Sequence, residues 1–145
     1  MSTRRTPNRR ICTAVASAAA AVLLAACGGS SGALTTEDVV PKLEAAGIDC
    51  TETSTAPVEE GIAATAVTCA LGETGGVVVI VADSPDELAK AKAELCAQIP
   101  GEQGNLEIAH GENWLSVTLS TVGVGAAQVS EALGGQVSKI DQYCA

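Results

Sequence analysis

The chain has 145 residues, of which 47% are apolar and 17% are charged, and its formal net charge is −9. This length suits one domain. Acids outnumber basic residues 17 to 8, which argues against binding nucleic acid through its phosphates, because that binding needs a cationic surface. The chain has no Phe, one Trp and one Tyr. Its core must therefore use small aliphatic side chains, and we expect it to need covalent support.

Residues 1–26 are predicted to form a secretory signal peptide. Residues 1–10 carry four arginines and no acid, and residues 11–26 are uncharged and rich in Ala. A basic segment, a short apolar segment and small residues at the end are the parts of such a signal. The apolar segment is shorter than the roughly 20 residues of a membrane-spanning helix. Two Arg-Arg pairs raise twin-arginine export as an alternative to ordinary secretion.

Leu24-Ala25-Ala26-Cys27 resembles the lipobox of bacterial prolipoproteins. The resemblance implies cleavage before Cys27, a diacylglycerol on its thiol, and an acyl chain such as palmitate on its amine. Two or more acyl chains hold a protein to a bilayer stably, whereas one does so only marginally. The richness in Ala, Val and Gly is also similar to small actinobacterial lipoproteins, many of which have no assigned function. The resemblance implies the extracytoplasmic face of the cell membrane.

Cleavage before Cys27 would change the charge of the protein. All four arginines leave with the signal, so four lysines remain against 17 acids, a net charge of −13. Anionic lipid head groups should repel so acidic a chain, which leaves the lipid as its membrane contact. Residues 27–34 comprise the lipidated Cys27 and a predicted flexible Gly/Ser-rich tether, whose r.m.s. span is about 15 Å. Residues 35–145 are then a single ectodomain near the membrane.

The remaining cysteines predict two disulfides. Cys12 leaves with the signal and Cys27 is taken by lipid. An even number of cysteines is left in an exported domain, where disulfides form: Cys50, Cys69, Cys96 and Cys144. A metal site is the rival, but the chain has one His and no Cys-x-x-Cys pair. Three connectivities are open, and the order of the predicted elements favours Cys50–Cys69 with Cys96–Cys144.

Hydrophobic periodicity and turn residues predict eight elements in residues 35–145. In chain order they are a helix over 36–46, strands over 48–52, 63–71 and 77–82, a helix over 84–99, strands over 106–109 and 114–120, and a helix over 125–133. The pattern of residues 135–145 does not decide between helix and strand. Three consecutive strands favour an antiparallel sheet. We expect a two-layer α+β domain, a sheet of four to five strands with helices on one face.

His110 is the only histidine, and the sequence has no Gly-x-Ser-x-Gly elbow. A nucleophilic hydrolase, which needs a base beside its nucleophile, is therefore disfavoured. Strand alternation places Glu107 and His110 on opposite faces, although a turn at Gly111 could bring His110 and Glu112 together. A solvated hairpin end is the favoured interpretation, with no metal and no cofactor.

Trp114 is the candidate contact for a ligand or partner, together with His110. Alternation places Trp114 opposite Leu115, Val117 and Leu119. If those three face the helices, Trp114 lies on the open sheet face, where an exposed aromatic can anchor a partner. The alternative is that Trp114 packs in a second hydrophobic cluster or under a loop.

The leading hypothesis is a membrane-anchored, non-enzymatic binding module of the cell envelope. Its partner would be another envelope protein or a small ligand. The alternative is a proteinaceous inhibitor of a secreted hydrolase that uses residues 53–61 as its contact, because rigidity lowers the entropic cost of binding. An enzyme or a metal-binding protein that uses His110 is the least favoured class.

Overall fold

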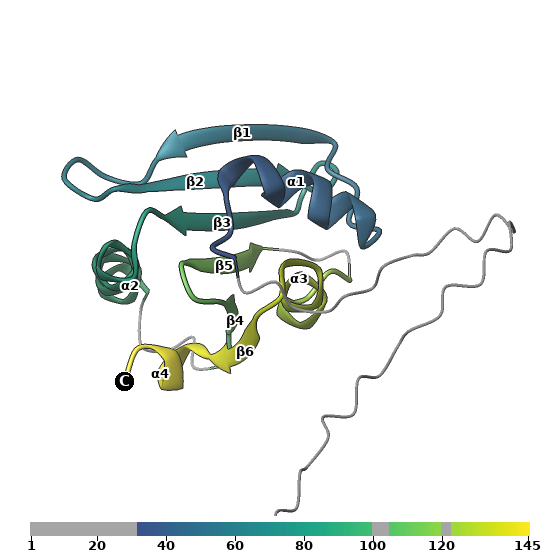
Figure 1. Cartoon of the computed structure of the whole chain (residues 1–145). Helices are drawn as coiled ribbons and strands as arrows, with labels where there is room; N and C mark the ends of the chain where they lie inside the picture. Colours follow the sequence, from purple (N-terminus) through teal and green to yellow (C-terminus); the bar gives the residue numbers. More distant parts are fainter. Residues whose placement is uncertain (1–31, 100–104, 120–122) are drawn as a thin grey trace, which may run out of the picture.

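The computed structural model describes residues 32–99, 105–119 and 123–145, which form one antiparallel sheet with helices packed against it (Figure 1). The elements in chain order are α1 (Thr36–Ala45), β1 (Glu52–Pro57), β2 (Ala64–Ala70), β3 (Gly76–Ala82), α2 (Pro85–Gln98), β4 (Glu107–His110), β5 (Trp114–Leu119), α3 (Ala126–Leu133), β6 (Gln136–Lys139) and α4 (Ile140–Tyr143). The strand order is β1-β2-β3-β5-β4-β6, and every neighbouring pair is antiparallel.

The α+β class and the antiparallel sheet are confirmed, but the described sheet has six strands instead of four to five. The sixth strand comes from the C-terminal segment. Its residues 136–139 form β6 along β4, and its residues 140–143 form α4. The segment whose pattern did not decide between strand and helix therefore contains one of each.

Helices cover both faces of the sheet, so the expectation of two layers with helices on one face is wrong. Alternate residues of β3 belong to different cores. Val79 lies in the core under α1 and α3, whereas Ile80 lies in the core under α2 and α4. The physical reason is the composition of β3, which is apolar and β-branched over nearly its whole length. A strand that is apolar on both faces needs cover on both.

At the start of α2, Ser84, Pro85 and Glu87 are residue types that favour a helix start. Ser84 caps the helix by accepting a hydrogen bond from the Glu87 N–H at 3.3 Å, and Pro85 occupies the first turn. The Glu87 carboxylate does not complete a capping box. It accepts from the Lys90 ammonium at 2.6 Å and from the Ala63 N–H at 2.8 Å. These two bonds lower the pKa of Glu87, and the second ties α2 to the segment before β2.

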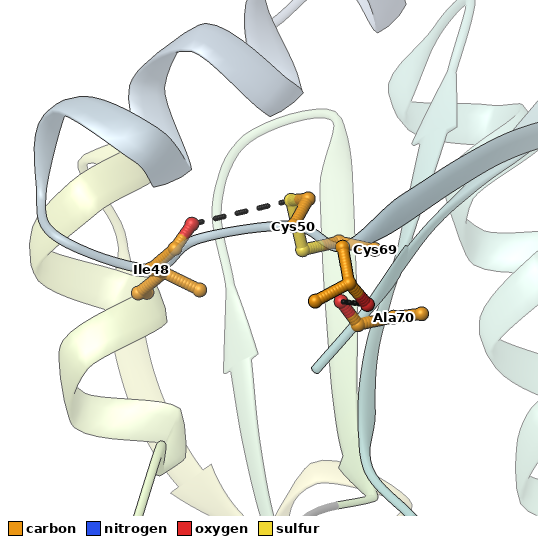
Figure 2. Close-up of a disulfide and its surroundings, with 5 residues drawn as sticks. Ile48, Cys50, Cys69 and Ala70 are labelled. Atoms are coloured by element: carbon orange, nitrogen blue, oxygen red, sulfur yellow. Dashed lines mark hydrogen bonds between the residues drawn. A yellow bond between two sulfur atoms is a disulfide. The ribbon is translucent and has the colours of Figure 1, made fainter. Parts of the chain in front are cut away.

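Both predicted disulfides are present. Cys50 and Cys69 join the segment before β1 to β2, with 5.1 Å between their Cα atoms (Figure 2). Cys96 and Cys144 join α2 to the C-terminal segment, with a Cα–Cα distance of 5.7 Å. The predicted strand over 48–52 lies too early, because β1 begins at Glu52. Residues 53–61, which the predicted elements leave between two strands, therefore contain most of β1.

The chain enters the domain at Leu34, inside the segment predicted to be a free tether. The Leu34 side chain is buried in the core under α1 and α3. Its backbone N–H donates to the Asn113 Oδ1 at 2.9 Å, and its carbonyl accepts from the Asn113 Nδ2 at 2.9 Å. Leu34, the last residue of the predicted tether, is therefore part of the folded domain, because its apolar side chain packs in the core.

Candidate functional site

The predicted signal peptide and the lipid attachment site at Cys27 lie outside the described residues. Their assignment stays a prediction from the sequence. Within residues 32–99, 105–119 and 123–145, no helix has both the length and the apolar character needed to cross a membrane.

Trp114 is not an exposed contact residue. Its side chain is only 2% exposed and belongs to the core under α1 and α3. A Cβ atom placed on Gly111 or Gly135 would collide with the indole, so the ring lies in a gap that two glycines leave open. The prediction of an open-face aromatic is wrong because α1 and α3 cover that face. Trp114 is buried, as the alternative expected, but it lies in the larger core and not in a second cluster.

His110 lies on the opposite face, in contact with Ser138 and Tyr143. The His110 Nε2 is 2.9 Å from the Ser138 Oγ, and the imidazole and phenol ring centroids are 4.8 Å apart. Ser138 is opposite Ile108 in the β4–β6 register, which puts it on the same face as His110. No sequence pattern points to Ser138, because the pattern of residues 135–145 does not decide between helix and strand.

Burial dominates the electrostatics of this cluster. Desolvation lowers the pKa of His110, and the positive charge of Lys92 lowers it further. The Lys92 ammonium lies 4.6 Å from the centroid of the Tyr143 ring, and burial raises the pKa of Tyr143. At neutral pH the imidazole is therefore neutral beside a hydroxyl. These contacts join α2, β4, β6 and α4, so the cluster fastens the C-terminal segment to the sheet.

The cluster of His110, Ser138 and Tyr143 contains few of the groups that catalysis needs. A Ser–His pair acts as a nucleophile and base when a third group orients the imidazole. His110 forms its hydrogen bond with Ser138, and Glu107 lies on the other face, paired in register with Lys139. In the described part of the chain, no three His, Cys, Asp or Glu side chains gather as metal ligands would. A turn at Gly111 could have brought His110 and Glu112 together, but the contacts of His110 among the described residues are with Ser138 and Tyr143.

A different surface stands out, the free edge of β1 at the top of Figure 1. Every residue of β1 is exposed. The strand pairs with β2 through an unbroken register, from Glu52 opposite Ala70 to Pro57 opposite Thr65. On its other side, no described element pairs with it. The backbone of β1 is thus half used by the sheet and half open.

The hydrogen-bond phase of the β1–β2 ladder shows which backbone groups are open. The Val58 N–H donates to the Ala64 carbonyl at 3.1 Å, and the register places these two residues opposite each other. In an antiparallel pair, residues that exchange hydrogen bonds alternate with residues whose groups point away. Glu52, Ser54 and Ala56 therefore bond to β2, and the groups of Thr53 and Thr55 point outward. Pro57, which has no N–H, is also on the outward phase, as edge prolines are.

Acidic residues stand at both ends of this edge. The sequence from Leu43 to Ala89 contains no Lys or Arg. Acids lie just before or at the start of β1 and just after its end: Asp49, Glu52, Glu59 and Glu60. All four are exposed. The middle of the strand, by contrast, is uncharged and has small side chains, so the edge is an uncharged strip of backbone between two negative ends.

Comparison with known proteins adds no family to this description. No protein-family model matches the chain, and neither a curated protein nor a solved structure matches it.

Proposed function

We propose that the protein is an exported lipoprotein, anchored to the extracytoplasmic face of a bacterial membrane through Cys27, and that its folded domain is a non-enzymatic binding module. The observation that carries the proposal is the pairing of all four cysteines that follow Cys27. Two disulfides in a small domain are typical of an oxidising, exported compartment. They also leave no cysteine of the domain as a competitor of Cys27 for lipid.

The free edge of β1 supports binding as the activity. A sheet edge with unpaired backbone groups is a template for another chain, and peptide recognition by strand addition uses such edges. The inhibitor alternative would use the same segment, because the proposed contact 53–61 contains most of β1. It would act there as a rigid strand and not as a flexible loop.

Metabolic labelling tests the anchor. We would express the full chain in a bacterial host with the lipoprotein pathway and feed the cells an alkyne analogue of palmitate. We expect the natural protein and the Cys12→Ser variant to carry the label and to be found in the membrane fraction. Residue 12 leaves with the signal, so its replacement should have no effect. The Cys27→Ser variant should carry no label. Label that persists on Cys27→Ser, or its absence from the natural protein, would contradict the proposal.

A further inference from the structure

We propose that β1 accepts an extended, lysine- or arginine-bearing segment of a protein partner as an additional antiparallel or parallel strand. This inference rests on the proposed binding function and names the chemistry of the partner. The backbone supplies the first half of the argument. The outward N–H and C=O groups of Thr53 and Thr55 belong to alternate residues of one strand, and an extended chain presents its own groups at that same two-residue spacing.

The edge of β1 has little of the protection that normally prevents strand addition. Edge strands are protected by short length, by lysines, by proline or by bulges. The opposite edge of the described sheet shows this protection, because β6 is four residues long, carries Lys139 and runs directly into α4. In β1, six residues pair in continuous register, and the only proline is the last one, Pro57. Among the hydrogen bonds of the described residues, none occupies the outward groups of Thr53 or Thr55.

Charge selects the partner. A second copy of this chain would pair its β1 with the first in antiparallel fashion. The Glu52 end of one copy would then lie opposite the Glu59 and Glu60 end of the other, and like charges that face each other across strands are destabilising. A segment with basic residues flanking a short uncharged centre instead meets an acid at each end. Electrostatic complementarity of this kind raises the association rate and suppresses wrong partners.

The test uses the mature lipidated protein in non-ionic detergent and three capped peptides. The first is Lys-Lys-Thr-Val-Thr-Lys-Lys, the second replaces every Lys with Glu, and the third is the first with its central amides N-methylated. Hydrogen–deuterium exchange of residues 52–57 reports binding. We expect the lysine peptide to slow this exchange. The glutamate and N-methylated peptides should bind at least about tenfold more weakly than the lysine peptide. This is the effect expected from the loss of one or two net hydrogen bonds or charge contacts.

Variants of the protein provide the matched control. Thr55→Pro removes an outward N–H and no bond to β2, so the lysine peptide should bind about tenfold more weakly. Thr55→Val changes the side chain at the same position and keeps the N–H, so it should bind as the natural protein does. If Thr55→Pro does not fold, the N-methylated peptide tests the same hydrogen bonds on the natural protein.

Three results would overturn the proposal. The first two are an N-methylated peptide or a glutamate peptide that binds as tightly as the lysine peptide. The third is self-association that Thr55→Pro abolishes, since a second copy of the chain would then be the occupant. Failure here is distinguishable from failure of the proposed function. A protein that carries palmitate on Cys27 but ignores the lysine peptide contradicts strand addition alone, whereas an unlabelled protein contradicts the lipoprotein assignment whatever the peptide does.

Discussion

The side chain of Asn113 forms hydrogen bonds with the backbone at Leu34, where the chain enters the domain. Its replacement should lower the free energy of unfolding. Asn113 is 6% exposed and makes three hydrogen bonds. Two go to the backbone of Leu34, and the third is donated to the Ala82 carbonyl at 3.1 Å. Each such bond contributes about 0.5–1.5 kcal/mol to the free energy of unfolding. Asn113→Ala should therefore lower the free energy of unfolding by about 3 kcal/mol.

That loss is large against a total stability of about 5–15 kcal/mol. Urea denaturation, followed by the fluorescence of Trp114, measures it. The matched control is Asn105→Ala, the same change at an exposed position, which should alter the unfolding free energy by less than about 0.5 kcal/mol. If Asn113→Ala unfolds within that same margin of the natural protein, the three hydrogen bonds do not hold the entry of the chain, and the reasoning fails.

Asn113→Asp keeps the hydrogen bond that the side chain accepts and removes the two that it donates. The new carboxylate still accepts from the Leu34 N–H, but it faces the carbonyls of Leu34 and Ala82, to which the amide donates. Burial and these carbonyls should raise its folded pKa above the unfolded value of about 3.9. The variant should then lose stability relative to the natural protein as pH rises above about 4. A difference that does not change with pH would refute this assignment of the donor.

Three further predictions follow from other contacts. Cys96→Ser, which opens the longer disulfide loop, should lower the free energy of unfolding by about 4 kcal/mol, and Cys50→Ser should lower it by about 3 kcal/mol in the chain-entropy model. Urea denaturation that shows the larger loss for Cys50→Ser would contradict this dependence on loop length. The pKa of His110 is lowered from 6.5, so as pH falls the unfolded chain binds a proton before the folded one, and stability should fall as pH drops below about 7. His110→Gln should flatten that part of the profile, and an unchanged slope would refute it. Gly135→Ala, whose Cβ would meet backbone, should cost about 1–3 kcal/mol, more than Gly125→Ala, where nothing lies within 4 Å; equal melting temperatures would contradict the close packing.

Local signals in the sequence predicted the local features of the fold. The Ser84-Pro85 start of α2 and both disulfides follow from residue types that have one strong local role. The number of strands did not follow, because β6 is only four residues long and is held by pairing with β4. Such a strand depends on its neighbour more than on its own pattern.

The coverage of the sheet was misjudged at β5. Trp114, Ser116 and Thr118 form its more polar face, which suggested solvent, whereas Leu115 and Leu119 suggested helices. In the structure Ser116 is fully buried, and Leu119 is 64% exposed. The apolar pattern of β3 carried the missing information, because a strand that is apolar on both faces predicts cover on both. The outward phase of the β1 backbone had no sequence signal, since it depends on pairing.

The intact mass of the mature protein, extracted from its own membrane without reducing agent, tests the central claim most directly. The account predicts a chain that begins at Cys27, carries the added mass of a diacylglyceryl group, and lacks two hydrogen atoms for each of the disulfides Cys50–Cys69 and Cys96–Cys144. A mass that retains residues 1–26, or that shows Cys27 without lipid, would contradict it.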